Sequence, residues 1–266
     1  MRTRPDGQIA LVTGANRGIG LEVCRQLAEM GASILLASRD VRKGERAIAK
    51  LGANQSNVKA IPLDVTDSGS IAAVARLVTD ECGRLDILVN NAGVSLNGFN
   101  ETVVRQTLAV NFFGALHVTD ALRPIMRQDG RIVMVSSGMG ELSAFSGPVR
   151  ERLSDPALTR DALIALMQSF ENAVGSRAHA ARGWPSSAYR ASKAGLNALT
   201  RVLAREPGNA ALRINAVSPG WVRTDMGGRS APRSIEIGGA SVVWAATLMR
   251  NGPTGGLFQD GERMDW

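Results

Sequence analysis

The only tyrosine of the chain, Tyr189, is followed four residues later by Lys193 in a segment with helical periodicity. Residues four apart share one face of a helix, so the phenol and the ammonium are expected to lie one turn apart. A free phenol has a pKa of about 10, and a nearby ammonium favours the phenolate and lowers that pKa. The pair is therefore a candidate general acid for work near neutral pH. On its own, the spacing also fits a structural helix with a half-buried tyrosine and a solvated lysine.

A glycine-rich segment lies near the start of the chain, between an apolar run that ends at Thr13 and a helical pattern. Its glycines let the backbone turn tightly and approach a pyrophosphate, whose charge meets the free N–H groups at the start of the helix. Glycines also occur in ordinary turns and helix caps, so they are weak evidence by themselves. Here the expected strand before them and the expected helix after them favour a dinucleotide site. The residues expected to contact the dinucleotide here are Gly14, Asn16, Arg17, Gly18, Ile19 and Gly20.

The end of the second apolar run indicates which dinucleotide is bound. NAD-binding proteins usually carry an acid there, which binds the ribose 2′-hydroxyl. This chain has Ser38 at that turn, followed by Arg39, and a guanidinium matches a 2′-phosphate. With Arg17 as a second cation, the sequence favours NADP over NAD. Asp40 is the alternative ribose ligand, although it also fits the N-cap of the helix that begins at Val41, which we prefer. Arg39 as a plain surface residue is the other alternative.

Short apolar runs alternate with helical patterns along the chain, and the runs are continuous, as in strands covered on both faces. The expected strands are Ile9–Thr13, Ser33–Ala37, Val58–Leu63, Leu85–Val89, Arg131–Val135, Leu212–Val217 and Gly256–Gln259. The expected helices are one that carries Ile19, Val23 and Leu27, then Val41–Leu51, Gly69–Cys82, Thr102–Arg127, Ser187–Arg205 and Ile235–Arg250. This alternation predicts a Rossmann-like α/β fold, a doubly wound parallel sheet of about seven strands with helices on both faces.

We expect one NADP-binding domain over residues 1–266, because a chain of 266 residues suits a single α/β unit. About fifty residues separate the fifth expected strand from the tyrosine helix, far more than an ordinary loop needs. They include a helical pattern, Leu163, Leu166, Phe170 and Val174. The segment from about 140 to 184 is therefore expected to be an inserted helical subdomain.

Composition excludes several other classes of protein. The net charge is +7, but the basic residues are dispersed and aromatic residues are only 4%, which argues against nucleic-acid binding. Two cysteines and two histidines provide no metal-ligand spacing, so no metal is expected. The start of the chain lacks the apolar stretch of a signal peptide, and the longest apolar run, Ala240–Met249, is too short to cross a bilayer. We therefore expect a cytoplasmic protein without membrane or nucleic-acid partners.

Together these segments resemble the short-chain dehydrogenase/reductase family, in order and over essentially the whole chain. The motifs that carry the resemblance are Thr13 to Gly20, Asn90-Asn91-Ala92-Gly93, Ser136-Ser137, Tyr189 with Lys193, and Pro219-Gly220. The long gap between Ser137 and Tyr189, the segment Pro219 to Met226 and the end Gly256 to Trp266 are similar to the monomeric NADPH-dependent carbonyl reductases. The resemblance implies a monomer, because the insertion would cover a surface on which other members assemble.

The resemblance also implies a role for each matching residue. Tyr189 would protonate the carbonyl oxygen as hydride arrives from NADPH, and Ser137, with Ser136 as the alternative, would hydrogen-bond that oxygen. Lys193 would tune Tyr189 and hold the nicotinamide ribose, and Asn111 would position a water of the proton relay. Further cofactor contacts are implied for Asp64, Val65, Asn91, Ala92, Gly93, Pro219, Val222 and Thr224. Trp221 would be a wall of the substrate pocket or a packing residue.

The sequence thus predicts an NADPH-dependent reductase of ketones, aldehydes or quinones that uses NADP(H) and a small-molecule carbonyl substrate. The alternatives are an alcohol dehydrogenase or enone reductase of the same family, and a non-catalytic NADP sensor. A non-catalytic sensor would be expected to lack Ser137, Tyr189 or Lys193, whereas all three are present. His117 and His179 are expected to be structural or surface residues.

Overall fold

The computed structural model describes residues 6–51 and 56–266. Residues 1–5, on which the expectation about a signal peptide largely rests, lie outside the described residues. No helix within the described ranges combines the length and the apolar character that a transmembrane span requires.

The described residues form an eight-stranded sheet in the order β3-β2-β1-β4-β5-β6-β7-β8. The strands are β1 (Ile9–Val12), β2 (Ser33–Ser38), β3 (Val58–Pro62), β4 (Leu85–Asn90), β5 (Met126–Val135), β6 (Arg213–Val217), β7 (Leu257–Gln259) and β8 (Glu262–Met264). The first seven pair in parallel, and β8 pairs with β7 antiparallel. The predicted Rossmann-like α/β class is confirmed, with one strand more than the seven expected.

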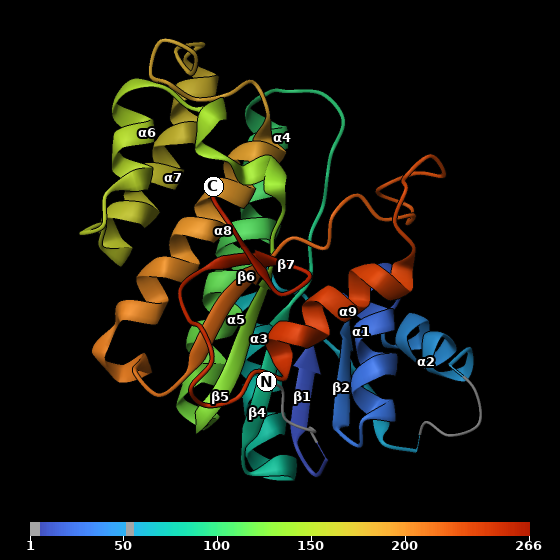
Figure 1. Ribbon diagram of the computed structural model, residues 1–266. Helices are drawn as coiled ribbons and strands as arrows, with labels where there is room; N and C mark the ends of the chain where they lie inside the picture. Colours follow the sequence, from blue (N-terminus) through green and yellow to red (C-terminus); the bar gives the residue numbers. More distant parts are fainter. Residues whose placement is uncertain (1–5, 52–55) are drawn as a thin grey trace.

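Successive residues of the central strands point to opposite faces of the sheet, and each face has its own apolar core. Leu11, Leu88 and Ile132 belong to one core, and their chain neighbours Val12, Val89 and Val133 belong to the other. The first core contains side chains of α3 (Ser68–Leu77), α4 (Glu101–Leu108), α5 (Ala115–Leu122) and α8 (Ala188–Arg205). The second is covered by α1 (Gly18–Glu29), α2 (Val41–Ala49) and α9 (Ile235–Ala246), which gather on one side in Figure 1.

The segment predicted as one helix over 102–127 is interrupted. A π-helical turn, Ala109–Gly114, separates α4 from α5, and a short 3₁₀ turn, Arg123–Ile125, follows α5. The chain then enters β5 at Met126, so the predicted helix was too long at its C-terminal end. Pro124 explains the stop, because proline cannot donate the backbone hydrogen bond that a helix interior requires.

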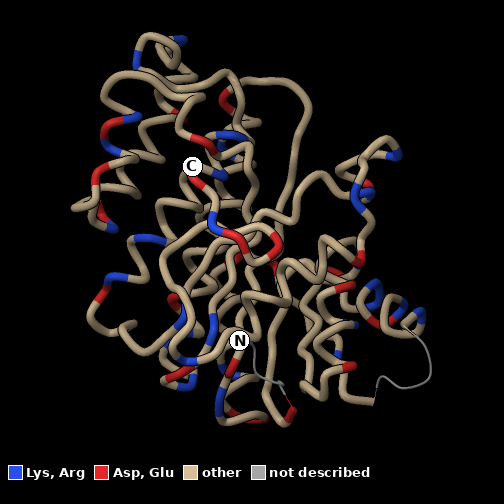
Figure 2. Tube along the Cα trace, viewed as in Figure 1, with Lys and Arg blue, Asp and Glu red and all other residues tan. Residues whose placement is uncertain are grey.

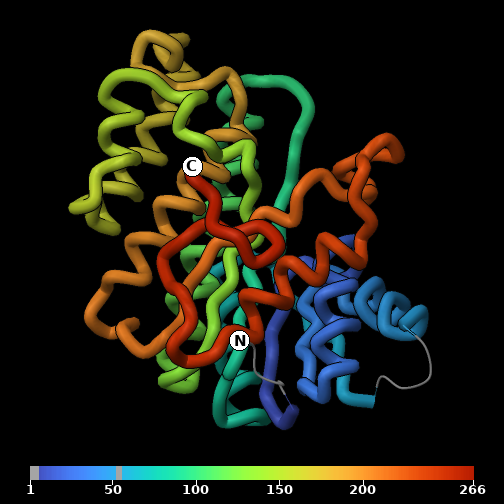
Figure 3. The backbone as a smooth tube through the Cα atoms, in the orientation of Figure 1, coloured from blue at the N-terminus to red at the C-terminus, as the bar shows by residue number. Residues whose placement is uncertain are grey.

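The segment before α8 contains α6 (Gly147–Ser154) and α7 (Arg160–Gly175). Figure 3 shows α6 in yellow-green and α7 in olive-yellow, stacked at the end of the molecule beside α4 and α8. Buried Leu163, Met167 and Phe170 of α7 join the first core. The insertion is therefore packed into the body of the fold and covers faces of α4 and α8.

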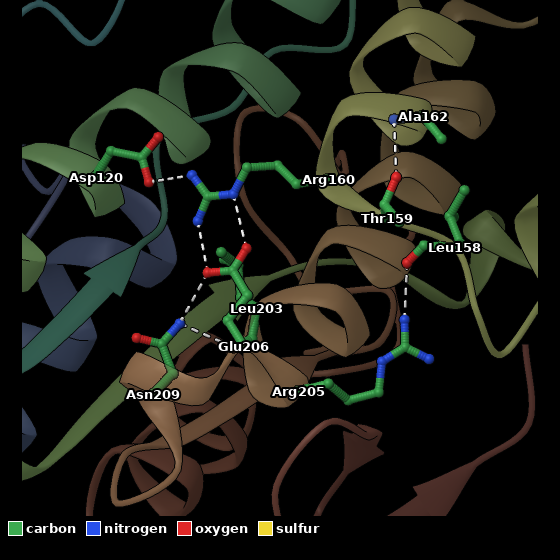
Figure 4. Close-up of polar contacts among 9 residues, drawn as sticks. All are labelled: Asp120, Leu158, Thr159, Arg160, Ala162, Leu203, Arg205, Glu206 and Asn209. Atoms are coloured by element: carbon green, nitrogen blue, oxygen red, sulfur yellow. Dashed lines mark hydrogen bonds and ion pairs between the residues drawn. The ribbon is translucent and has the colours of Figure 1, made fainter.

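An ion-pair network fixes the start of α7 (Figure 4). The Arg160 guanidinium donates to Asp120 of α5 at 2.5 Å and to both carboxylate oxygens of Glu206, just after α8, at 2.7 and 2.8 Å. Asn209 donates to the same Glu206 carboxylate at 3.2 Å. Arg160 thus connects the insertion to two helices of the Rossmann body.

Candidate active site

A cavity of about 1110 Å³ opens at the carboxyl ends of the parallel strands, where ligands bind in open α/β sheets. Nearly all residues predicted for the site line it. They are Gly14, Asn16, Arg17, Gly18, Ile19, Gly20, Arg39, Asp64, Val65, Asn91, Ala92, Gly93, Ser137, Tyr189, Lys193, Pro219, Val222 and Thr224. Asn111 is the exception: it is buried behind the cavity wall.

The glycine loop approaches the end of β4 so closely that side chains are excluded. Gly14 has a φ of +61°, and a Cβ there would lie 2.8 Å from the Cα of Ala92. A Cβ on Gly20 would lie 2.3 Å from the Nδ2 of Asn91. Thr13 holds the two segments together, because its Oγ1 accepts hydrogen bonds from the N–H groups of Asn91 and Ala92 at 3.0 and 2.9 Å. The loop therefore presents bare backbone to the cavity.

The end of the cavity beside β2 and α2 is lined by cationic side chains. Exposed Arg39 at the end of β2 and Lys43 in the first turn of α2 both line it. Lys43 is not among the site residues predicted from the sequence, although its position four residues after Arg39 could have indicated it. Figure 2 shows Lys and Arg clustered on α2 beside this end. Asp40 is the N-cap of α2, because its Oδ1 accepts from the N–H groups of Arg42 and Lys43 at 3.0 and 3.3 Å.

Asp64 lies where β3 ends, on the same side of the cavity as Arg39. Its Oδ1 accepts hydrogen bonds from the hydroxyl and the N–H of Thr66 at 2.7 and 2.9 Å. The Thr66 hydroxyl, with a smaller contribution from the Arg39 guanidinium, holds the pKa of Asp64 below its ordinary value. Asp64 is therefore an ionised acceptor at neutral pH.

The segment after β6 reaches across to the glycine loop. Asp225 accepts from the Arg17 guanidinium at 2.8 Å in an exposed ion pair, and the Cγ2 of Thr224 lies 3.6 Å from where a Cβ on Gly18 would be. The Trp221 indole N–H donates to the carbonyl of Gly227 at 2.8 Å and so fixes the ring across the loop. The two segments therefore lie side by side in the lining of the same cavity.

Tyr189 and Ser137 meet at the other end of the cavity. Tyr189 lies in the first turn of α8, whose N-cap hydroxyl, Ser187, accepts from the N–H of Arg190 at 3.3 Å. Burial raises the pKa of Tyr189, and a hydrogen bond with Ser137 opposes that shift. The sequence predicts that Lys193 lowers this pKa. In the structure burial raises it instead, so the phenol is protonated at neutral pH.

Lys193 lies one turn after Tyr189, with its Nζ 5.5 Å from the centre of the tyrosine ring. The ammonium donates to the carbonyl of Val135 at 2.7 Å. Burial lowers the pKa of Lys193 to about 8. A Cβ on Gly93 would lie 3.8 Å from this Nζ and 3.5 Å from the Oδ1 of Asn111, so both polar groups converge on the bare backbone of Gly93.

Asn111 and Ser136 are engaged in internal hydrogen bonds. The Asn111 side chain accepts from the N–H of Val94 at 2.8 Å and donates to its carbonyl at 2.9 Å. The Ser136 hydroxyl donates to the Oδ1 of Asn197 at 2.6 Å and is buried. Ser137 is half-buried, and its hydroxyl faces Tyr189. Of the two serines, Ser137 is the one whose hydroxyl is placed beside the phenol.

The part of the cavity lining near Tyr189 includes four large apolar side chains that are exposed to solvent. Leu96, Met139, Trp221 and Met226 line the cavity and are exposed there. Sequence reasoning had singled out only Trp221 of these four. Their chain positions are far apart, and nothing in their local patterns distinguishes them from core residues.

Neither histidine lines the cavity. The ring of His117 stacks on Phe113 with centroids 6.1 Å apart on the outer side of α5. The Nε2 of His179 lies 3.0 Å from the hydroxyl of Ser186, a cavity residue, and its ring meets Phe99 edge-on. A structural role suits both residues.

Comparison with known proteins matches residues 8–149 to the family described as short chain dehydrogenase, and residues 156–251 to the family described as enoyl-(acyl carrier protein) reductase. The chain is 35% identical to carbonyl reductase (NADPH) 1 of Sus scrofa, covering 97% of this chain and 94% of the relative. It is 36% identical to the Homo sapiens protein of the same name, covering 97% and 98%. Among solved structures, salutaridine reductase from Papaver somniferum superposes with a TM-score of 0.89 at 33% identity, over 95% of this chain and 99% of that one.

Proposed function

The chain belongs to the short-chain dehydrogenase/reductase family, and on that premise we propose that it is an NADPH-dependent reductase that converts the carbonyl of a ketone, aldehyde or quinone to an alcohol. The observation that carries the proposal is the meeting of Tyr189 and Ser137 in the cavity that the glycine loop borders. The relatives named carbonyl reductase (NADPH) 1, matched over nearly their whole length, support the same reaction.

The cavity residues fit NADPH. The bare backbone at Gly14 and Gly20 and the N-terminus of α1 suit a pyrophosphate. Arg39 and Lys43 suit a 2′-phosphate, and Arg17 supplies a third cation on release from Asp225. The Oδ1 of Asp40 already accepts two backbone N–H groups at the start of α2. This makes the carboxylate a poorer ligand for the ribose hydroxyls than the sequence alternative supposes. When bound, the cofactor supplies the hydride.

The protein's own residues handle the proton. The Tyr189 hydroxyl, protonated at neutral pH, donates its proton to the carbonyl oxygen of the substrate as negative charge develops there. The Ser137 hydroxyl donates a hydrogen bond to the same oxygen and stabilises that charge. In this proposal Ser136, which is bound to Asn197, has only a structural role.

Lys193 and Asn111 complete the proton path. The ammonium of Lys193, one turn below Tyr189, is placed to hold the nicotinamide ribose and to return a proton to the phenolate. Asn111 holds Val94 and thereby the backbone beside Gly93, on which Lys193 also converges. We also propose that Asn111 positions a water of the proton relay, although the residue is buried behind the cavity lining.

The substrate end of the cavity suits a neutral, apolar carbonyl compound. Leu96, Met139, Trp221 and Met226 supply apolar contact, whereas Arg39, Asp40, Lys43 and Asp64 all lie at the nucleotide end. The other charged lining residues are already engaged: Arg17 pairs with Asp225, and Lys193 donates to the Val135 carbonyl. A carboxylate or phosphate on the substrate would lose hydration there without a matching charge.

We also propose a single cytoplasmic domain that works as a monomer. Helices α6 and α7 cover faces of α4 and α8 and share their apolar core. Cys24 and Cys82 are both free thiols, as suits a reducing compartment. Light scattering should accordingly give a mass near 28.1 kDa.

The direct test is a spectrophotometric screen in which NADPH and NADH oxidation is followed with ketones, aldehydes, quinones and enones. Turnover with NADPH and a carbonyl, with the alcohol identified as product, is the expected result. NADPH binding without oxidation of the cofactor by any member of the panel would favour the sensor.

Reduction of a conjugated C=C bond is a second candidate, favoured by the match of residues 156–251 to the enoyl-(acyl carrier protein) reductase family. Enone substrates separate the two candidates, because carbonyl reduction gives an allylic alcohol and C=C reduction gives a saturated ketone. Mass alone does not distinguish these isomers, so the products are identified by NMR.

A further inference from the structure

Buried Ser218, at the end of β6, stands between the two loops that the proposed reaction must hold in register. Its Oγ accepts a hydrogen bond from the N–H of Gly138, the residue after Ser137, at 3.3 Å. The same Oγ accepts from the N–H of Gly220 at 3.3 Å. One hydroxyl therefore joins the serine loop to the Pro219–Gly220 turn.

Gln259, the last residue of β7, completes this arrangement from the C-terminal end of the chain. The Ser218 hydroxyl donates to the Oε1 of Gln259 at 3.2 Å, and Gln259 lines the active-site cavity. A hydroxyl has one hydrogen and two acceptor lone pairs. Because both lone pairs of Ser218 receive glycine N–H groups, its hydrogen is directed to Gln259, whose amide must present oxygen to it.

The C-terminal strands hold Gln259 firmly. The N–H of Ser218 donates to the carbonyl of Phe258 at 2.8 Å, in the β6–β7 ladder. In the turn that follows, the Arg233 guanidinium donates to both oxygens of Asp260 at 2.9 and 2.6 Å. The methyl carbon of Met264 in β8 lies 3.4 Å from where a Cβ on Gly138 would be. The β7–β8 hairpin thus packs directly against the serine loop.

We propose that Gln259 is a positioning residue for the reductase reaction: its amide oxygen orients the Ser218 hydroxyl, which fixes the separation between Ser137 and the Pro219–Gly220 turn. The inference rests on the proposed function, since it assigns Ser137 to the substrate oxygen and the turn to the cofactor. A displacement of even 1 Å in such a constellation can reduce rates about a hundredfold. The C-terminal hairpin is accordingly part of the active-site scaffold.

A double-mutant cycle tests this role. Gln259→Leu removes the acceptor at similar volume, and kcat is expected to fall about tenfold, with KM for NADPH changing much less. In a Ser218→Ala background, Gln259→Leu should have no further effect, because the hydroxyl on which Gln259 acts is gone. Equal losses in the two backgrounds would mean that Gln259 contacts the substrate itself, and would overturn the proposal.

Gln259→Glu provides the conservative rescue. The glutamate keeps the acceptor oxygens and lacks the NH₂ group, so its kcat should stay near that of the native enzyme. Loss of activity in both the Glu and the Leu variants would assign the role to the amide NH₂ and contradict the inference. This comparison does not involve Ser218, so it decides the question even if Ser218→Ala does not fold.

Gln128→Leu is the matched control, because Gln128 is exposed near the opposite end of β5. Native turnover is measured first, and its absence would count against the proposed function alone. In that case hydrogen exchange at residues 136–140 still tests the inference. Gln259→Leu should speed that exchange and Gln128→Leu should not; equal exchange in both variants would refute the positioning role.

Discussion

The proton on Tyr189 is the central feature at the scale of single residues. Burial raises the pKa of the phenol and the Ser137 hydrogen bond opposes that change, so a protonated acid faces the cavity at neutral pH. Tyr189→Phe removes that proton and leaves the ring. We expect kcat to fall about 10²- to 10⁴-fold, the range of general-acid contributions, with little change in the Kd for NADPH. Steady-state kinetics and fluorescence titration measure the two quantities; a kcat near the native value would remove Tyr189 from the acid role.

The proposed function assigns the choice of cofactor to Arg39, which lines the cavity. Arg39→Asp places a carboxylate where the 2′-phosphate is expected, so affinity for NADPH should drop far more than affinity for NADH. Arg46→Asp makes the same charge change on the exposed side of α2, away from the cavity lining, and is the control. Titration of both variants with both nucleotides is the measurement. If the two variants behave alike, only the net charge matters and Arg39 is a surface residue.

Lys193 makes a pH-dependent contribution to stability. Burial lowers its pKa to about 8 in the folded chain, whereas an unfolded lysine keeps its proton to about 10.4. Between these pH values the unfolded state binds more protons, so the free energy of unfolding from this residue rises with pH. Below about pH 8 lysine is protonated in both states and the slope disappears.

Urea unfolding of the ligand-free protein at pH 8 and pH 10 tests this contribution of Lys193. Because other groups also titrate in this window, the relevant quantity is the difference between the native chain and Lys193→Met. That difference should shift in favour of the native chain at the higher pH. If the difference in the free energy of unfolding is the same at both pH values, burial does not lower the pKa of Lys193 in the folded chain.

At the scale of elements, Arg160 tests how the insertion is attached. The side chain is mostly buried and bridges Asp120 and Glu206, so Arg160→Met removes the guanidinium from both carboxylates, while Glu206 keeps the Asn209 amide as a donor. Since hydrogen bonds to charged groups are worth about 1.5–3 kcal/mol, we expect a loss of about 2 kcal/mol in the free energy of unfolding. Exposed Arg152 on α6 provides the control variant, Arg152→Met. Equal unfolding curves for the two variants would show that the network adds nothing beyond apolar packing.

Continuous apolar runs predicted the parallel strands, because strands covered on both faces need apolar residues at every position. The same signal could not find β8, since Glu262–Met264 is only three residues long and mostly exposed, with Met264 packed against the core. The predicted helix over 102–127 covered α4 and α5 but missed the π-helical turn between them, because helical periodicity continues through a turn that adds a residue without changing the apolar character. It also ran past Leu122, where Pro124 ends the helix. Local patterns therefore identify the buried elements and miss edge strands and irregular turns.

The candidate site was predictable where its residues follow a strand directly, as in the glycine loop and at Asn91 and Ser137. Ser218 and Gln259 were not, because their importance arises from contacts across 41 residues of sequence. Asn111 was placed in the site by resemblance, and the structure buries it one layer behind the cavity. Sequence patterns give the residues at strand ends, whereas contacts between distant loops require the fold.

At the scale of the whole molecule, the sheet brings the carboxyl ends of its seven parallel strands, each from a different part of the chain, to one cavity with a charged end and an apolar end. In the proposed function, that polarity would orient a phosphate-rich cofactor and a neutral carbonyl compound toward each other, with Tyr189 and Ser137 between them. The proposed function therefore comes to one claim at this scale: NADPH would give a hydride to a carbonyl carbon while Tyr189 supplies the proton.

The most direct measurement uses NADPH carrying deuterium at both C4 positions of the nicotinamide, with a ketone that the screen has identified. The account predicts an alcohol that carries one deuterium on the carbinol carbon, formed by the native chain and nearly absent with Tyr189→Phe. An alcohol without deuterium at that carbon, or equal deuterium transfer by the phenylalanine variant, would contradict it.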